Sequence, residues 1–185
     1  MLDNKHVRDE LNRFAKNVVS KAKSNLTRKK RLVSGNLYRS LGYDLKVMPN
    51  SMSLEFEMEP YGEYIDKGVK GAKPNLFDHY TQKAPMSKYS YRDKMPPRDA
   101  ILNLVKKKRL RLRNDKGQFI KGGYNNMAFL IQRSIYAQGI KPSLFFTKPF
   151  LAAYKNLDKK IIEAYALDME YLLDKKFEAA EGPGN

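Results

Sequence analysis

Three carboxylates stand at alternate positions near the middle of the chain, at Glu55, Glu57 and Glu59. Alternate residues of a β-strand point to the same side of a sheet and lie about 7 Å apart. Such a row could hold a divalent cation, as in a metal-dependent nuclease, but no supporting pattern of Lys or Asp accompanies it. We therefore interpret the row as a surface, either a solvated face or a docking face for a basic neighbour.

The other residue types that commonly do chemistry are scarce or lack a motif. The chain has no cysteine, which excludes thiolate nucleophiles and disulfides. Its two histidines, His6 and His79, belong to no metal-binding pattern, and the nucleophile-elbow and phosphate-loop motifs are missing. The sequence therefore predicts no enzyme, with no catalytic residue, no metal site and no cofactor.

The strongest compositional signal is a basic stretch. Residues 105–123, VKKKRLRLRNDKGQFIKGG, contain eight Lys or Arg among nineteen residues and one acidic residue. Residues 67–121 carry 16 basic and 4 acidic residues, whereas the remainder carries 20 and 16, for a net charge of +16 over the chain. The candidate contact residues are Lys106, Lys107, Lys108, Arg109, Arg111 and Arg113.

Two interpretations of this basic stretch stay open. A concentrated positive field attracts polyanions and acidic protein surfaces alike. The stretch could be a docking arm that contacts a neighbouring subunit of an assembly. It could instead contact the phosphates of DNA, without reading the base sequence.

Length and composition favour a single domain over residues 1–185, with one elaboration. The apolar fraction is 42% and the charged fraction is 30%. No apolar run approaches the roughly 20 residues that cross a bilayer, and the first residues lack the apolar segment of a secretory signal. We therefore expect a protein made in a cytoplasm, without membrane contact.

Hydrophobic periodicity predicts the first half of the fold. Apolar residues recur every three or four positions over residues 4–29, which favours a helix that Asp3 or Asn4 could cap. Alternating apolar residues predict antiparallel strands over 41–47 and 52–58, with a turn at 49–51. A short helix or turn should then end at Gly68, and residues 70–97 read as a long loop.

The second half contains three more predicted segments. Pro97 suits the first turn of a helix that runs into the basic stretch. Apolar residues on both sides of the sequence NDKG predict a small β-hairpin over residues 110–120. A further helix is expected over residues 124–138, with Leu130 among its inward residues. The last helix should run from residue 148 to about residue 179.

The predicted fold class is α+β. A small antiparallel β-sheet is covered by a long N-terminal and a long C-terminal helix, with a basic helix-plus-hairpin insertion. Residues 1–69 and 124–181 form the expected core, and about 70–123 form the insertion.

Three short blocks, in this order, resemble a single family. SGNLYRSL (residues 34–41) resembles the family's TGxLxxS segment, which follows its first helix. YGEYIDKGVKG (61–71) is similar to its YAxYVExGT segment, which follows the hairpin, and KPFLAAYKNL (148–157) resembles the xPFLxPA segment that opens the last helix. The family is the head–tail completion proteins, also called tail-completion or neck proteins, of tailed bacteriophages.

The resemblance implies a structural virion protein at the head–tail junction, assembled in the host cytoplasm. Copies would form a closed ring, of about six or about twelve subunits, through which DNA passes. Portal, adaptor and tail proteins are the implied partners, with possible nonspecific contact to channel DNA. The expected subunit interface comprises Glu55, Glu57, Glu59, Tyr61 and Tyr64.

The matching positions also imply scaffold roles. Gly35, Gly68, Pro149 and Phe150 are expected to anchor the fold, because they turn the chain or fix the start of the last helix. The alternative function, which needs only the charge, is a free, sequence-nonspecific nucleic-acid-binding protein.

Overall fold

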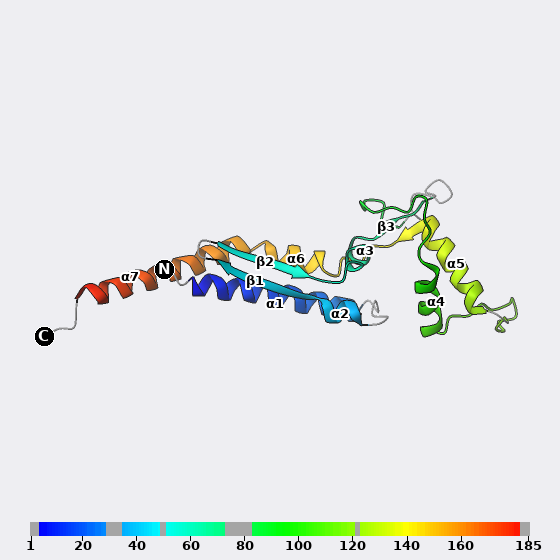
Figure 1. Ribbon diagram of the computed structural model, residues 1–185, viewed down its shortest axis with the longest axis horizontal. Coiled ribbons are helices and arrows are strands. Elements are labelled where there is room, and N and C mark those ends of the chain that lie inside the picture. The colour runs from blue at the N-terminus through cyan, green and yellow to red at the C-terminus, as the bar shows by residue number, and fades with distance from the viewer. Residues whose placement is uncertain (1–3, 29–34, 49–50, 73–82, 121–122, 182–185) are drawn as a thin grey trace. The chain divides into compact units, whose positions relative to one another are not determined.

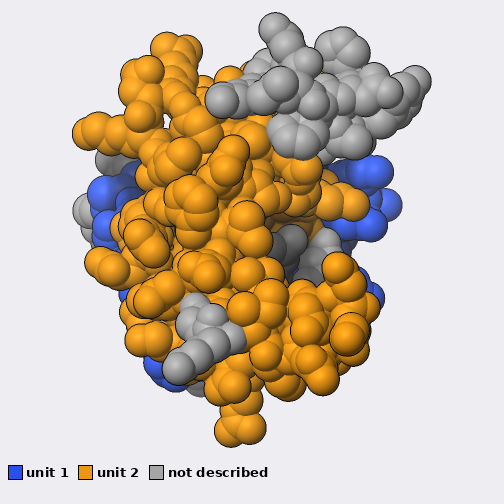
Figure 2. Space-filling view, turned by 90° about the vertical axis from the view of Figure 1, so that its right-hand side faces the viewer, with its two compact units in different colours: residues 1–28, 36–59, 145–185 blue, residues 29–35, 60–144 orange. Residues whose placement is uncertain are grey.

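The computed structural model describes residues 4–28, 35–48, 51–72, 83–120 and 123–181. The chain divides into two compact units, which Figure 2 colours separately. Unit 1 takes in residues 1–28, 36–59 and 145–185, and unit 2 takes in 29–35 and 60–144. Unit 2 extends on both sides of the insertion expected at about 70–123. The turn expected at 49–51 and the proposed cap Asp3 lie, partly or wholly, outside the described residues.

Unit 1 is an α+β arrangement, as the sequence predicts. A two-stranded antiparallel sheet lies along the long helices (Figure 1). The elements are α1 (Lys5–Arg28), α2 (Asn36–Ser40), β1 (Gly42–Met48), β2 (Ser51–Glu57), α6 (Thr147–Tyr154) and α7 (Leu157–Glu181). The small sheet and the long N-terminal and C-terminal helices are therefore confirmed.

The core of unit 1 lies along the apolar face of α1. Residues Phe14, Val18, Ala22 and Leu26 recur every four positions and are buried. This face contacts β1, β2, α6 and α7. Because the helix presents one continuous apolar stripe, elements from two separate stretches of the chain, residues 36–59 and 145–185, can close over it.

The strands pair in the register that the alternation requires. Tyr43 lies opposite Phe56, and Leu45 lies opposite Leu54. The apolar pairs thus share one side of the hairpin, which faces α1 and α6 through Phe56. The hairpin leaves Met48, at its far end, half exposed.

Two helices of unit 1 differ from the expectation. The short helix α2 lies between Gly35 and β1, where a direct turn into the strand was expected. The last helix is not continuous, since α6 ends at Tyr154 and α7 begins at Leu157. The carbonyl of Asn156 accepts a backbone hydrogen bond from Lys160, which makes Asn156 the N-cap of α7, a position that asparagine favours.

Unit 2 is built around a pair of packed helices and a minimal strand pair. Its elements are α3 (Gly62–Lys67), β3 (Val69–Lys70), α4 (Arg98–Lys107), α5 (Gly123–Gln138) and β4 (Gly139–Ile140). Ile101, Val105 and Ala128 form its buried cluster, so α4 covers one face of α5. The prediction that Leu130 points inward is wrong, because Leu130 lies off the covered face and is 48% exposed.

The expected long loop is partly tied down. Within the described residues, Ser90 forms a parallel bridge with Lys70, and the backbone N–H of Lys83 donates to the carbonyl of Gln138. The Ser87 hydroxyl donates to the carbonyl of Gly68 at 2.7 Å. Residues 73–82 of this loop, and with them His79, lie outside the described residues.

Candidate functional site

The acidic row on β2 already has a basic neighbour on its own hairpin. Asp44 of β1 lies directly opposite Glu55 of β2, which places two carboxylates side by side. Lys46 lies between them, with its Nζ 3.0 Å from Glu55 Oε2 and 3.9 Å from Asp44 Oδ2. The hydrogen bond that Lys46 donates to Glu55, and then the charge of Glu55, raise the pKa of Lys46. A partner subunit is therefore not needed to neutralise Glu55.

The three carboxylates do not form one continuous strand row. Strand β2 ends at Glu57, which is exposed opposite Gly42, and Glu59 lies beyond it. Glu59 is half-buried, and its backbone N–H donates to the hydroxyl of Ser40 at 3.1 Å. The surface that remains for docking on this strand is thus limited to Glu57 and the outer side of Glu55.

Tyr61 and Tyr64 lie in unit 2, whereas the acidic row lies in unit 1. Both tyrosines are exposed, and the ring of Tyr64 packs edge-on against Tyr89 with centroids 4.7 Å apart. Beside them, Glu63 accepts a hydrogen bond from Lys67 at 2.6 Å. This bond, together with a hydrogen bond from Tyr89, lowers the pKa of Glu63 to about 2. The expected interface residues are therefore divided between the two units.

The excess positive charge belongs almost entirely to unit 2. Unit 2 contains 21 basic and 6 acidic residues, whereas unit 1 contains 15 and 14. The net charges are thus +15 and +1. Sequence counting located this asymmetry, although it placed the boundaries of the basic part at different residues.

Residues 106–120, here called the basic arm, begin with a sharp change of direction at the end of α4. The backbone N–H of Leu110 donates to the carbonyl of Val105, and that of Arg109 donates to Lys106. This pair of bonds is the Schellman motif, whose turning residue is usually glycine. Here it is Arg109, with a φ of 52°.

The arm then forms the predicted hairpin. Arg113 bridges to Phe119 across a turn in which Asn114 accepts a hydrogen bond from the backbone N–H of Gly117. Arg113 stacks on the ring of Phe119 at 4.6 Å, and Arg111 lies over Tyr124 at 4.7 Å. Aromatic rings thus hold both guanidinium groups at the surface.

The candidate contact cations all lie on this arm and are exposed. They are Lys106, Lys107, Lys108, Arg109, Arg111 and Arg113. Among the described residues, neither Arg111 nor Arg113 has a carboxylate partner within ion-pair distance. Both are therefore available to an external anion.

The expected fold anchors occupy constrained positions. Gly68 has a φ of 74°, and a Cβ there would lie 2.4 Å from the carbonyl oxygen of Ile140. Gly35 has a φ of 78° immediately before α2. Pro149 is buried in the first turn of α6, where its missing N–H leaves no bond unmade. Phe150 packs against the rings of Phe14 and Phe56, both at 5.9 Å.

Sequence reasoning missed a carboxylate that joins the first and last helices. Asp168 of α7 is 2% exposed and accepts hydrogen bonds from the backbone N–H groups of His6 and Val7, at 2.9 and 3.0 Å. It therefore caps α1, a role that the sequence assigned to Asp3 or Asn4. Asn4 does occupy the N-cap position, since its carbonyl accepts the backbone N–H of Arg8 at 2.9 Å, but its side-chain Oδ1 has no hydrogen-bond partner among the described residues. The available signal was an acidic residue within the apolar stripe of α7.

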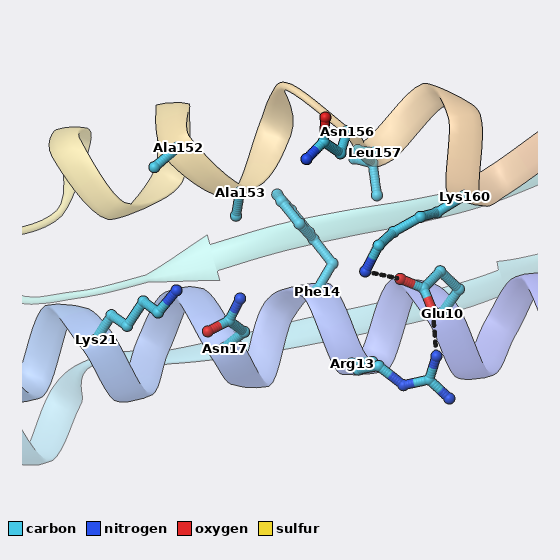
Figure 3. Close-up of a pocket in the computed structure, with 10 residues that line it drawn as sticks. All are labelled: Glu10, Arg13, Phe14, Asn17, Lys21, Ala152, Ala153, Asn156, Leu157 and Lys160. Atoms are coloured by element: carbon cyan, nitrogen blue, oxygen red, sulfur yellow. Dashed lines mark hydrogen bonds and ion pairs between the residues drawn. The ribbon is translucent and has the colours of Figure 1, made fainter.

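A second missed feature is a groove of about 260 Å³ between α1 and the α6–α7 pair (Figure 3). Phe14, Ala153 and Leu157 supply apolar walls. Glu10 lines its other end and is buried, paired with Arg13 at 2.5 Å and with Lys160 at 3.1 Å. Two cations already neutralise this carboxylate. We therefore interpret the groove as part of the packing interface between these helices.

Among the residues that the structure describes, no group of three or more His, Asp and Glu residues could hold a metal ion. None of the described helices has the length and apolar composition needed to span a membrane.

No protein-family model, curated protein or solved structure matches the chain.

Proposed function

We propose that this chain is a structural subunit of the head–tail junction of a tailed bacteriophage. Several copies form a closed ring between the portal or adaptor and the tail, and DNA passes through its centre. The ring is assembled in the host cytoplasm and remains in the virion. In this role the protein acts through its shape and its contacts, and it carries out no reaction.

The observation that carries the proposal is the order of the three blocks that resemble tail-completion proteins. Residues 34–41 cover α2 and its junction with β1, and residues 61–71 cover α3 and β3. Residues 148–157 cover α6 and the start of α7. Each block thus falls where one element gives way to the next, as expected if the resemblance reflects a common scaffold.

The surface of the protein supports the same proposal. Unit 2 carries a net charge of +15 whereas unit 1 is nearly neutral, and many large apolar side chains of α7 are exposed. Exposed apolar surface of this kind usually marks a protein–protein contact. Both features are expected of a subunit that is surrounded by other copies of itself and by neighbouring proteins.

The direct experiment labels the chain in assembled particles. A short peptide tag is placed after residue 185 of the encoded protein, and purified virions are imaged by electron microscopy with a gold-labelled antibody. Gold at the junction of head and tail is the expected result. A tagged chain that is abundant in infected cells but missing from purified particles would overturn the proposal.

A second candidate function, nonspecific nucleic-acid binding, is favoured by the Arg111–Phe119–Arg113 arrangement. Anisotropy measurements with random-sequence DNA between 50 and 200 mM salt test it, because each neutralised phosphate contributes about −0.9 to the slope of log K against log salt. Changing Lys106, Lys108, Arg111 and Arg113 to Ala should flatten this slope by about 3 to 4. The matched control removes the same charge from Lys155, Lys159, Lys175 and Lys176 in unit 1.

A further inference from the structure

Helix α7 carries a second apolar face in addition to the one that packs on α1. Its inner face buries Ala164 and partly buries Ile161. The other, here called the outer stripe, runs along the helix at spacings of four, three, four and four. It consists of Ile162, Ala166, Met169, Leu173 and Phe177. Ile162 is 69% exposed and Phe177 is 66% exposed, whereas Met169 between them is half-buried, so most of this stripe is left uncovered by the described part of unit 1.

The exposed length of the stripe is substantial. Ile162 and Phe177 are fifteen residues apart, which in an α-helix is about 22 Å. The second half of α7 also continues past Asp168, the point where α1 begins (Figure 1). Over these four turns the helix is thus exposed to solvent on more than one side. Exposure of apolar side chains to water is unfavourable unless another surface covers them.

One edge of the outer stripe is acidic. Glu163, Glu170 and Asp174 each directly follow a member of the stripe, so they lie along the same flank of the helix. Lys159 approaches Glu163 only to 3.9 Å, and both of these side chains are highly exposed. Among the described residues, Glu170 and Asp174 have no cation within ion-pair distance. The stripe therefore presents apolar groups beside two carboxylates, Glu170 and Asp174, that lack a cation partner among the described residues.

The basic arm of unit 2 has the complementary composition. Phe119 is 58% exposed and Ile120 is 43% exposed at the end of its hairpin. The cations that flank these two apolar residues include Arg111 and Arg113, whose guanidinium groups are held against aromatic rings. The arm thus offers apolar groups beside two guanidinium groups, those of Arg111 and Arg113, that lack a carboxylate partner among the described residues.

We propose that the outer stripe of α7 in one copy binds the basic arm of a second copy. This inference rests on the proposed self-assembly and names the two surfaces that form its interface. Each copy gives one arm and receives one arm, which is the head-to-tail contact from which closed rings are built. Apolar contact supplies most of the affinity, and the opposite charges fix the register.

Other partners for the stripe fit less well. Two α7 helices paired antiparallel through their outer stripes would bring their acidic edges together, which is repulsive. The phosphates of a nucleic acid would likewise be repelled by the acidic edge of the stripe. An acidic and apolar helix face instead suits a basic and apolar arm, and this chain carries one.

The test reverses the charges of each surface. The stripe variant carries Glu163→Lys, Glu170→Lys and Asp174→Lys, and the arm variant carries Lys106→Glu, Lys108→Glu and Arg113→Glu. Sedimentation velocity should show that self-association weakens at least about tenfold in each variant alone, because like charges then face each other. An equimolar mixture of the two variants should recover association, since reversed stripe meets reversed arm and native stripe meets native arm.

The control variant carries Lys5→Glu and Lys16→Glu on α1 and Lys148→Glu on α6, three exposed positions of unit 1. It changes the net charge as much as the arm variant does and should assemble as the unmodified chain does. Thermal unfolding of all variants establishes that each is folded.

Three outcomes would overturn the inference and bear differently on the proposed function. If the unmodified chain forms rings and both variants still do, the interface lies elsewhere and the proposed function survives. If only a single chain carrying both sets of reversals recovers, the arm docks within its own chain. If the unmodified chain remains monomeric at all concentrations and is missing from virions, the inference and the proposed function fail together.

Discussion

The carboxylate of Asp168 caps helix α1, which begins at Lys5, by binding the backbone of His6, 162 residues earlier in the chain. It accepts the backbone N–H of His6 at 2.9 Å, and its Oδ1 also lies 2.7 Å from His6 Nδ1. The N–H groups in the first turn of α1 have no carbonyl partners within the helix, so a carboxylate there satisfies donors and meets the positive end of the helix dipole. Asp168 therefore joins the first and last helices of unit 1, together with the ion pair between Glu10 and Lys160.

Replacing Asp168 should destabilise unit 1. Asp168→Asn removes the charge and one acceptor while keeping the volume, and we expect the free energy of unfolding to fall by roughly 1 to 2 kcal/mol. Urea denaturation followed by circular dichroism measures this change. Asp174→Asn on the exposed part of the same helix is the control, and it should change stability by less than about 0.5 kcal/mol. Equal losses in the two variants would contradict the capping role.

The same carboxylate should make stability depend on pH. Burial opposes its ionisation, but the backbone N–H groups of His6 and Val7 and the His6 side chain outweigh this and lower the pKa of Asp168 below its ordinary value of 3.8. The stabilisation is therefore complete above about pH 4 and is lost as the pH falls through the lower folded pKa. Denaturation curves at several acidic pH values should show the difference between the native chain and Asp168→Asn shrinking as acid is added.

Gly68 should tolerate no side chain. Gly68→Ala places a Cβ against the carbonyl oxygen of Ile140 in a backbone conformation with positive φ, and we expect a loss of roughly 3 kcal/mol or more. Gly117→Ala is the matched control, because Gly117 has a φ of 78° but no atom within 4 Å of the added Cβ. It should cost about 1 kcal/mol. Similar losses at both positions would mean that φ alone, and not the close approach, constrains Gly68.

Arg109 occupies a position that glycine would fill with less strain. Arg109→Gly relieves the positive φ at the turning residue of the Schellman motif, and we expect unit 2 to gain about 1 kcal/mol. Thermal unfolding measures the gain. Lys108→Gly, one residue earlier, with a φ of −86°, should destabilise instead. If Arg109→Gly destabilises unit 2 by as much as Lys108→Gly does, the strain argument is wrong.

Phe150 should matter far more than its neighbour Leu151. The ring of Phe150 packs against four others, those of Phe14, Phe56, Phe146 and Tyr154. Phe150→Ala should therefore cost about 3 kcal/mol. Leu151→Ala changes an exposed residue of the same helix and should stay within about 0.5 kcal/mol. Chemical denaturation of both variants distinguishes an anchoring ring from general loss of helix contact.

The fold could be predicted from sequence where one physical signal dominated. The four-residue recurrence from Phe14 to Leu26 located α1, and strict alternation located both strands of the hairpin. The tight-turn sequence NDKG located the arm's hairpin. In each case the local pattern and the tertiary packing favour the same structure.

The candidate site was harder to predict, because its features depend on residues distant in sequence. Asp168 occupies the place of an apolar residue in the inner face of α7, and only the position of His6 explains why a carboxylate is buried there. Glu10 in α1 is similar, since its partner Lys160 lies 150 residues away. The acidic row itself could be located from the sequence, but the ion pair that Glu55 makes within the hairpin could not. Lys46 was visible in the sequence, but its contact with Glu55 depends on the register of the hairpin.

Unit 1 is assembled from three segments of the chain, residues 1–28, 36–59 and 145–185. Most of unit 2, residues 60–144, lies between the second and the third of these segments. During synthesis, therefore, α1 and the hairpin emerge from the ribosome long before α6 and α7 can cover them. Unit 2 can form its own core during this interval, while the apolar face of α1 in unit 1 is not yet covered by α6 and α7. We expect nascent chains stopped before residue 145 to bind chaperones that recognise exposed apolar segments, and full-length release to end that binding.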